Sequence, residues 1–482
     1  MEAHEPKCAQ QEAAELPLVS SIDASAGPAD LSTILESLEP REGGKQTSGG
    51  GGDQPIYRMP AEWEPHSACL ILFPHNPNTF RVDRASEEIL ALALAIATHG
   101  GEAVCLLCKD ASHAEGVSDR LRGFLPKGSC APIGVGVCPS DDTWARDTAP
   151  TFVFCRGRND QRNRLIGMDW TFNAYGGPEE GAYWPCKRDQ RIARAICSET
   201  TVAVDPALRG AHGGLGSGSL AGSLSISGSL SVPLVLEGGS FHTDGEGTLL
   251  TTAECLLNPN RNPHLSREDI EAVLKRALGV SVVLWLPYGL RNDHDTNGHV
   301  DNFCAFVRPG HVVLAWTDNE DEGGDEEDGD ATNYERCRAA QKYLESHTDA
   351  MGRTIEITRL CLPDPPLAYT EEEAATIGQP STGDSDAAAL ARLPNEPMAA
   401  SYVNYYVANQ AVLVPQFAAP GESTDHDRSL RETDQRALDT LRLLYPNRTV
   451  VGVPSREILL GGGNIHCQTQ QVPAFVEQGG FR

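Results

Sequence analysis

The feature that most limits what this chain can fold into is an internal repeat. Residues 236–242 and 460–466 each carry an apolar residue, a glycine pair, a small polar residue, a second apolar residue and a histidine, in that order. Self-similarity of this kind indicates a fold built from similar units that bury their apolar faces against one another. The repeat therefore predicts one large α/β domain assembled from repeated units.

The chain around each glycine pair follows a common plan of helix, buried strand and polar loop. After the first pair, a helix is predicted from Ser266, which forms a capping box with Asp269, to a stop at Gly279. The same reasoning predicts further helices over 86–98 and 436–445, strands over 102–107, 132–137, 280–286 and 449–453, and a hairpin over 401–417. Such units predict a radial α/β repeat protein, and not a doubly wound sheet, with the polar loops meeting near a central axis.

Three low-complexity segments stand outside this plan. Residues 1–54 are rich in Glu, Ala, Ser and Gly, so they bury too little apolar surface to order themselves, and a disordered tail is predicted. A Gly/Ser/Leu run near 209–231 and an acidic run near 318–330 are predicted to be surface insertions. The remaining chain, 55–482, is expected to form the single folded domain.

The charge and cysteine content exclude several classes of protein. The 67 Asp and Glu against 39 Lys and Arg leave a formal charge of −28, whereas nucleic-acid binding needs clustered Lys and Arg. The acidic excess fits a small cationic substrate, although it more commonly serves solubility. The 14 cysteines follow no disulfide framework, and neither a signal peptide nor a long apolar run is present. We therefore expect a reduced cytoplasmic protein that binds neither nucleic acid nor membrane.

Four polar loops carry the residues with chemical potential, and they span 140–148, 237–244, 295–302 and 461–467. Cys467, His299 and a carboxylate such as Asp301 are the minimum set for covalent thiol catalysis. The glycines before the cysteine, including Gly463, allow backbone amides to approach a thiolate, and the nucleophile is expected to have a lowered pKa. Taken singly each signal is weak, but acids and histidines recurring at the same point of a repeat favour a catalytic site.

Other interpretations of the same loops remain open from the residues alone. His242, Asp244, His299 and Asp301 could form a site for a hard metal ion, although residues two apart on a strand suit a substrate contact equally well. A cysteine protease needs one nucleophile and one base, and it would leave Asp147 and Glu237 without a role. A catalytically idle binding scaffold would have no need of this set of residues.

Several stretches of the chain resemble the agmatine deiminases of the guanidino-modifying, or pentein, superfamily. Three of them read Met59-Pro60-Ala61-Glu62-Trp63-Glu64-Pro65-His66, Trp144-Ala145-Arg146-Asp147-Thr148 and Thr296-Asn297-Gly298-His299-Val300-Asp301-Asn302. The others cover residues 169–173, 236–239, 255–262, 399–404 and 461–471. They run in order from about Arg58 to Pro473, so the resemblance covers nearly the whole chain beyond the tail.

The resemblance implies a fold, a reaction and a role for each site residue. The implied fold is a five-bladed α/β propeller with pseudo-fivefold repeats. The implied reaction is hydrolysis of agmatine to N-carbamoylputrescine and ammonia, a step of putrescine biosynthesis, without metal or organic cofactor. By residue match, Cys467 would attack the guanidinium carbon, while Asp147 and Asp301 would bind its NH groups. His299 would act as acid and base, and Glu237 would hold that histidine. Trp144 would line the substrate chain, with Gly463 nearby.

The chain departs from the family pattern at a few positions. The aromatic residues that commonly follow the Glu-Pro-His element are replaced here by residues 70–74, Tyr175 stands where the family has tryptophan, and Ala149 where it has glycine. These changes leave the chemical groups in place and concern recognition of the distal amine. A peptidyl- or free-arginine deiminase is the nearest alternative, and it would need a cation for the substrate carboxylate. A homo-oligomer is expected by family analogy alone.

Overall fold

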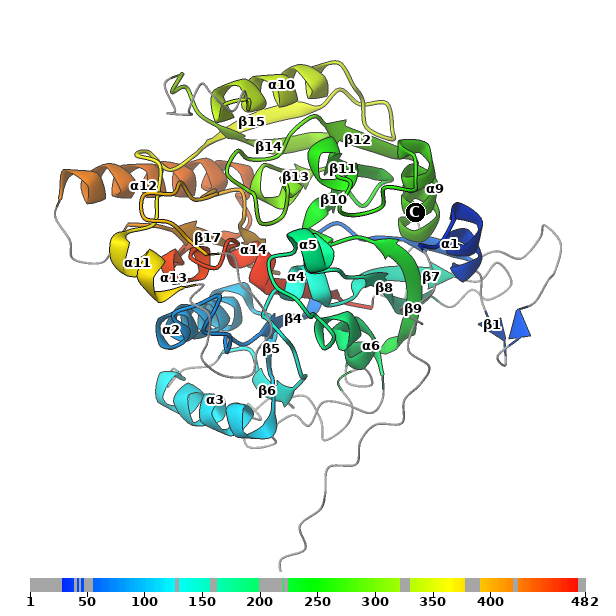
Figure 1. Cartoon of the computed structure of the whole chain (residues 1–482), viewed down its shortest axis with the longest axis horizontal. Coiled ribbons are helices and arrows are strands. Elements are labelled where there is room, and N and C mark those ends of the chain that lie inside the picture. Colours follow the sequence, from blue (N-terminus) through cyan, green and yellow to red (C-terminus); the bar gives the residue numbers. More distant parts are fainter. Residues whose placement is uncertain are drawn as a thin grey trace, which may run out of the picture.

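The computed structural model describes residues 28–38, 41–42, 45–46, 55–125, 130–156, 163–198, 220, 224–320, 330–377, 391–418 and 424–475. Its helices and strands form a mixed α/β fold, which confirms the predicted class (Figure 1). The longer helices are α2 (Val82–Ala95), α3 (Ala111–Phe124), α9 (Arg267–Leu278), α10 (Asn333–Glu345) and α12 (Asp425–Leu444). The shorter ones are α1 (Leu31–Ser37), α4 (Ala145–Thr148), α5 (Gly177–Glu180), α6 (Ile192–Cys197), α8 (Ala253–Leu256), α11 (Glu371–Thr376), α13 (Arg456–Leu459) and α14 (Ile465–Gln468).

Within the described residues, five sheets of three or four strands form the body, and a separate pair β1–β2 (Arg41–Glu42, Lys45–Gln46) lies near the N-terminus. Three sheets have three strands: β10–β11–β12 (Phe241–Thr243, Thr248–Thr252, Val282–Leu286), β13–β14–β15 (Cys304–Arg308, His311–Trp316, Glu356–Cys361) and β16–β17–β18 (Tyr406–Val407, Ala411–Gln416, Thr449–Pro454). Two have four: β19–β4–β5–β6 (Thr469–Pro473, His66–Leu72, Ala103–Cys108, Ile133–Val137) and β3–β7–β8–β9 (Ile56–Arg58, Thr151–Arg156, Asn163–Thr171, Ile226–Val235).

The five sheets share one topology, which confirms the predicted repetition. In each sheet an antiparallel pair is followed by a strand parallel to the second member of the pair, as in β10–β11–β12 and β13–β14–β15. Figure 1 shows short helices α4 and α14 near the middle of the view and the long helices α3, α9, α10 and α12 at the periphery. A closed five-bladed propeller remains a prediction.

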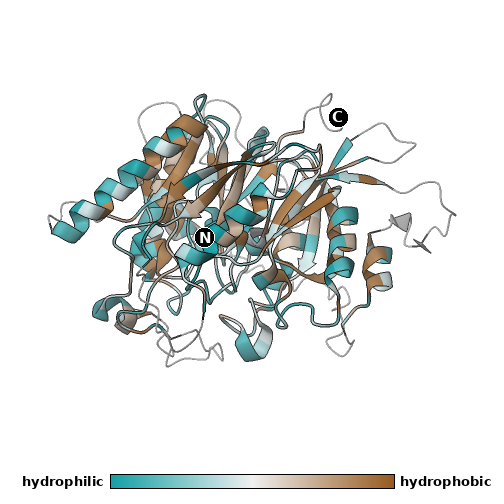
Figure 2. Ribbon diagram, turned by 90° about the horizontal axis from the view of Figure 1, so that it is seen from above, coloured by the Kyte–Doolittle hydropathy of each residue, from teal (hydrophilic) through white to brown (hydrophobic). Residues whose placement is uncertain are grey.

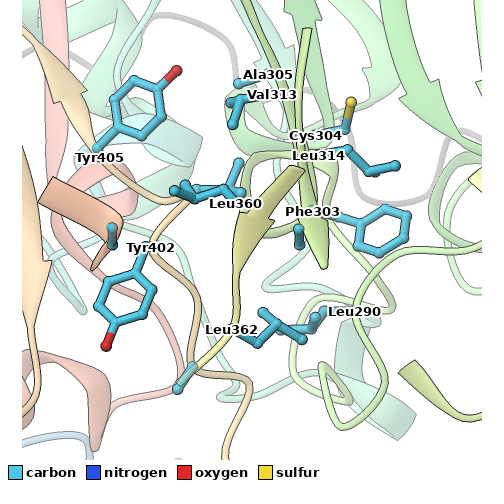
Figure 3. Packing of buried hydrophobic residues seen from close by; sticks show 14 of the residues in the cluster. Leu290, Phe303, Cys304, Ala305, Val313, Leu314, Leu360, Leu362, Tyr402 and Tyr405 are labelled. Carbon is cyan, nitrogen blue, oxygen red and sulfur yellow. The ribbon is translucent and has the colours of Figure 1, made fainter. Parts of the chain in front are cut away.

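Apolar side chains join the sheets to the helices that cover them. Figure 2 shows strands that are mostly hydrophobic and helices with one hydrophobic and one hydrophilic face, as expected for helices packed on a sheet. The largest cluster joins β13, β14 and β15 to the chain around Tyr402 and Tyr405, where Phe303, Leu360 and both tyrosine rings are buried (Figure 3). This packing holds the loop that precedes β13.

The C-terminal strand completes the sheet that contains the first long strand of the body. β19 pairs antiparallel with β4, with Thr469 opposite Ile71, and Ala474 N–H donates to the Pro65 carbonyl at 2.7 Å. The pairing fixes the segment that directly precedes β19, which is α14. As a result, residues from the two ends of the folded body, 400 positions apart in sequence, lie side by side.

Most local predictions are confirmed, with corrections at three places. The capping box of Ser266 and Asp269 is present, and Gly279 ends α9 at φ 69°, where an added Cβ would lie 1.8 Å from the Tyr57 carbonyl oxygen. Helix α12 begins at Asp425 and not near 436, because Thr424 caps it and its first turns are polar, with no apolar period to mark them. The segment near 209–231 is not all insertion, since strand β9 begins at Ile226. Residues 209–219 and 321–329 lie outside the described residues.

The predicted disorder of residues 1–54 is wrong for one segment within them. Helix α1 (Leu31–Ser37) is capped by Asp30 and buries Ile34, and Leu38 directly after it is buried as well. Tyr57 donates a hydrogen bond from its hydroxyl to the Leu38 carbonyl at 3.1 Å. The two apolar side chains join the cluster that contains α9, a contact that composition alone does not reveal. Among the described residues, no helix is long and apolar enough to cross a membrane.

Candidate active site

Five candidate site residues come from four separate segments, each next to a strand. Asp147 lies in α4, Glu237 follows β9, His299 and Asp301 precede β13, and Cys467 lies in α14 just before β19. The structure brings all five together in the interior, and each side chain is at most 6% exposed. The predicted convergence of the polar loops is therefore present in the structure.

The nucleophile candidate is contacted by polar side chains from two other segments of the chain. The Cys467 Sγ lies 3.5 Å from Asp301 Oδ2, and Asn404 Nδ2 donates to the same sulfur at 3.1 Å. An added Cβ on Gly463 would lie 3.1 Å from Cys467 Sγ and 2.6 Å from Trp144 Cζ3. Trp144 and Cys467 belong to one apolar cluster, so the indole and the thiol line the same small region.

His299 lies between two carboxylates without a short contact to either of them. Its Nε2 is 3.7 Å from Glu237 Oε2, and its Nδ1 is 4.0 Å from Asp147 Oδ1. Both ring nitrogens are buried and have no hydrogen-bond partner among the described residues, and the same holds for Glu237 Oε2 and Asp301 Oδ1. Buried polar atoms are normally paired, so this group of unpaired atoms marks a candidate place for a polar ligand.

The carboxylate of Asp147 is held in a fixed orientation by two neutral donors. Gly239 N–H donates to its Oδ1 and the Tyr175 hydroxyl donates to its Oδ2, both at 2.8 Å. Tyr175 stands at one of the positions where the chain departs from the family pattern, and it contacts Asp147 directly. The residue patterns carried no signal for this contact.

Burial dominates the protonation equilibria of the site. Burial, together with Asp301 and Asp147, raises the pKa of the Cys467 thiol well above its ordinary value. The expected lowering of this pKa by the glycine loop is therefore wrong for the unliganded protein, because burial and two carboxylates outweigh the donors from the Asn464 backbone and the Asn404 side chain. Burial also raises the pKa of Asp147 to about 6, although His299 limits the increase. Burial opposes protonation of His299, but Asp147 and Glu237 raise its pKa well above the usual range.

An arginine that the site prediction missed orients Glu237. Arg261 Nε donates to Glu237 Oε1 at 2.7 Å, while its other nitrogens donate to the carbonyls of Tyr175 and Thr296. Burial of Glu237 is outweighed by Arg261, which lowers the carboxyl's pKa and keeps it ionised beside His299. Arg261 lies in one of the stretches that resemble the family, but nothing in its spacing indicates this contact.

A second buried group, also missed, lies behind Asp301. Glu62 accepts hydrogen bonds from His466 at 2.8 Å and Arg146 at 3.1 Å, and its other oxygen lies 3.4 Å from His242 Nε2. Arg146 directly precedes Asp147 in the chain, but its guanidinium reaches Glu62. The histidine that precedes Cys467 in the repeated segment was the only signal in the sequence for this group.

The alternative metal site made of His242, Asp244, His299 and Asp301 is not the arrangement observed. Asp244 accepts from the backbone N–H groups of Glu246 and Thr248 in a turn, and His242 faces Glu62. Within the described residues, the groups whose atoms could share an ion are Glu62–His242–His466 and Glu237–Cys255–His299. An arginine contacts the carboxylate of each group, so both are better suited to hydrogen bonding than to metal ligation.

Gly239 provides a direct test of how closely this site is packed. A Cβ at this position would lie 2.7 Å from His299 Nδ1, 2.8 Å from Asp301 Oδ2 and 3.1 Å from Asp147 Oδ1. We expect Gly239→Ala to lower kcat/KM roughly 100-fold, because displacements near 1 Å at reacting groups have effects of this size. Steady-state kinetics would measure it. Gly116→Ala, in α3 with no atom within 4 Å of the added Cβ, is the control and should leave activity unchanged.

Comparison with known proteins places the chain among relatives that match nearly all of it. The family model for Porphyromonas-type peptidyl-arginine deiminase matches residues 58–473. The agmatine deiminase of Ectopseudomonas mendocina is 42% identical over 420 residues, which cover 87% of this chain and 96% of that protein. The agmatine deiminase of Medicago truncatula is 40% identical over 423 residues, which cover 87% of this chain and 97% of that protein. The solved agmatine deiminase of Enterococcus faecalis superimposes with a TM-score of 0.66 at 30% identity, covering 87% of this chain and 96% of that one. The chain therefore belongs to the Porphyromonas-type peptidyl-arginine deiminase family, in which these relatives are agmatine deiminases.

Proposed function

We propose that the protein hydrolyses agmatine to N-carbamoylputrescine and ammonia through a covalent amidino-cysteine intermediate. The observation that carries the proposal is a buried thiol, Cys467, near Asp301 and Asp147, together with His299 ring nitrogens and an Asp301 oxygen that have no hydrogen-bond partner among the described residues. A guanidinium group offers five N–H donors in a planar fork, which suits two facing carboxylates. The agmatine deiminase names of relatives about 40% identical to this chain support agmatine as the guanidine.

The substrate's charge supplies what the unliganded site lacks. Asp301 Oδ1 has no hydrogen-bond partner in the part of the chain that the structure describes, and Asp147 is oriented by Tyr175 and Gly239, so both carboxylates can accept from the guanidinium. A cation bound there would offset the negative charges that raise the pKa of Cys467, and the thiol would release its proton to solvent as the substrate binds. Activation of the nucleophile is thereby coupled to the presence of substrate.

His299 and Glu237 are suited to move the remaining protons. The Cys467 thiolate would attack the guanidinium carbon, and the C–S bond would form. Protonated His299 would give its proton to the departing nitrogen, which leaves as ammonia when the C–N bond breaks. Neutral His299 would then take a proton from water, and the resulting hydroxide would attack the amidino carbon. The C–S bond would break to return the Cys467 thiolate, and the added hydroxyl would lose its proton to solvent as the carbonyl forms. Glu237, kept ionised by Arg261, would stabilise the charged imidazole in both steps.

The arrangement of cations favours an amine-bearing guanidine over arginine. Arginine would require a cation for its carboxylate, and the two arginines at the site, Arg146 and Arg261, are occupied by Glu62 and Glu237. The name of the matching family nevertheless makes peptidyl- or free-arginine deimination the alternative to test. We also infer that the repeated sheets close as a five-bladed propeller, with a homo-oligomeric state and a cytoplasmic location as further predictions.

The test is to assay the purified protein, without added metal, on agmatine, free arginine and an arginyl peptide. Release of ammonia together with N-carbamoylputrescine from agmatine is the expected result, and a chelator should leave the rate unchanged. Turnover of arginine or the peptide alone would retain the mechanism and reject the substrate. No release from any guanidine would reject the enzyme in favour of the binding scaffold.

The raised pKa of Asp147 predicts an acidic limit to activity. The carboxylate must be ionised to hold a guanidinium, so kcat/KM should fall about tenfold for each pH unit below a pKa of about 6. Steady-state kinetics between pH 4.5 and 8 would measure this fall of kcat/KM on the acidic side of the pH profile. It should appear chiefly as a rise in KM. A limb near pH 4, the value of an unperturbed aspartate, would contradict the assignment.

A further inference from the structure

We propose that His466, held by Glu62, is the positioning residue for Asp301, and that it acts as a fixed imidazolium which leaves one Asp301 oxygen for the substrate. The inference rests on the proposed function, because it assigns Asp301 to the guanidinium. It concerns residues that do not touch the reacting atoms and act only through that aspartate.

The observation behind it is an unbroken chain of buried hydrogen bonds. His466 Nδ1 lies 2.9 Å from Asp301 Oδ2, and His466 Nε2 lies 2.8 Å from Glu62 Oε1. All three side chains are 6% exposed or less. The ring is also fixed through its backbone, since His466 N–H donates to Asn404 Oδ1 at 2.9 Å and its carbonyl accepts from Arg146 Nε at 3.3 Å.

The geometry determines the charge of the ring. Both imidazole nitrogens face carboxylate oxygens at hydrogen-bond distance, and an ionised carboxylate only accepts. A neutral imidazole has one donor and would leave one of the two contacts as an acceptor facing an acceptor, whereas an imidazolium satisfies both. The direction of titration agrees, because burial and Arg146 are outweighed by Glu62 and Asp301, which raise the pKa of His466.

The groups that face this ring come from every element packed around it. Glu62 lies in the chain between β3 and β4, Arg146 in α4, His242 in β10 and Asp301 in the turn before β13, and Cys467 follows His466 directly. Within this group the two negative charges of Glu62 and Asp301 are balanced by the two positive charges of Arg146 and the His466 imidazolium. Burial of Asp301 is outweighed by His466, which lowers the pKa of the carboxyl, whereas burial raises that of Asp147.

The consequence for Asp301 is that its two oxygens have different tasks. Oδ2 accepts the hydrogen bond from the His466 imidazolium and lies 3.5 Å from Cys467 Sγ. Oδ1 is buried and has no hydrogen-bond partner among the described residues. Asp147 is oriented differently, by the neutral donors Tyr175 and Gly239. Of the two carboxylates assigned to the guanidinium, only Asp301 is hydrogen-bonded to an imidazole, since His299 stays 4.0 Å from Asp147.

Two replacements of His466 separate positioning from simple packing. Asparagine places its amide nitrogen near the position of Nδ1 and can still donate to Asp301, whereas glutamine reaches the position of Nε2 and can donate only to Glu62. We expect His466→Gln to raise the Kd for agmatine about 30-fold and His466→Asn to raise it less than about fivefold, since a charge-assisted hydrogen bond is lost only in the first. Glu62→Gln, which keeps the size of the side chain, should raise it about tenfold.

The measurement is calorimetric titration of agmatine into each variant made in a Cys467→Ala background, with thermal melts to confirm folding. Adding Asp301→Asn should cancel the effect of His466→Gln, leaving less than about a threefold difference, because the histidine acts through that carboxylate. Equal losses for asparagine and glutamine, or losses that stay additive with Asp301→Asn, would overturn the proposal.

A substrate-independent readout separates failure of this inference from failure of the proposed function. Nitrogen-15 spectra of histidine-labelled unliganded protein, assigned with His466→Asn, should show both ring nitrogens of His466 protonated at pH 8, and this signature should be lost in Glu62→Gln. A neutral His466 ring at pH 7 would overturn the inference even if agmatine is turned over. A cationic ring in a protein that releases ammonia from no guanidine would reject the function and leave the ion pair standing.

Discussion

Cys467→Ala is expected to lower kcat for agmatine hydrolysis by roughly 10⁵-fold, the order of loss seen when a covalent nucleophile is removed. The reason is that no other described thiol lies beside Asp301 and Asn404, so the C–S bond of the intermediate cannot form. Agmatine binding should survive, because the two aspartates that hold the guanidinium remain. Ammonia release and calorimetric titration would measure the two effects separately.

The matched control for this substitution is another buried cysteine. Cys105 lies in β5, where burial raises the pKa of its thiol to about 12, and Cys105→Ala should keep kcat within about twofold of the unmodified protein. If Cys467→Ala retained more than a hundredth of the activity, the covalent mechanism would be rejected, since hydrolysis would then proceed without the nucleophile.

His299→Gln is expected to lower kcat about 1000-fold, within the range attributed to general acid–base catalysis. The replacement removes the group that protonates the leaving nitrogen and activates water, while the neutral amide fits between Glu237 and Asp147. Because both chemical steps depend on His299, mass spectrometry of the reacting variant should show little free product and slow formation of the amidino adduct.

His311→Gln is the control for a change of buried histidine elsewhere. His311 lies in β14, where its Nε2 contacts Thr358 Oγ1 at 2.8 Å, and its replacement should affect stability more than turnover. A smaller loss for His299→Gln than for this control would remove His299 from the proton-transfer role and move it to Asp147 or Glu237.

The local structure follows from sequence because its causes are local. The capping box at Ser266, the stop at Gly279 and the hairpin before β18 depend on residues a few positions apart, and each was correctly predicted. The three corrections concern segments that carry no clear local signal, and one of them is the start of β9 at Ile226 inside the predicted insertion. Ile34 is ordered because it is buried in the cluster that contains α9, and the first turns of α12 are polar and lack an apolar period.

The five chemical groups were also identified from the sequence, since they recur in polar loops at the same point of the repeated unit. What the sequence could not show is how those groups are held and charged. Tyr175 on Asp147, Arg261 on Glu237 and Glu62 on His466 are pairs more than 20 residues apart, and no spacing rule connects them.

The state of the nucleophile illustrates the difference most clearly. A glycine-rich loop before Cys467 suggests a stabilised thiolate, yet the folded protein raises the pKa of the thiol, because burial and two aspartates outweigh the donors of the loop. The sequence by itself determined the class of fold, the repeated unit and which polar loops meet in the interior. Only the tertiary structure decided the distances, burial and charge around them, because electrostatic energy depends on separation in space and on access to water and not on order along the chain.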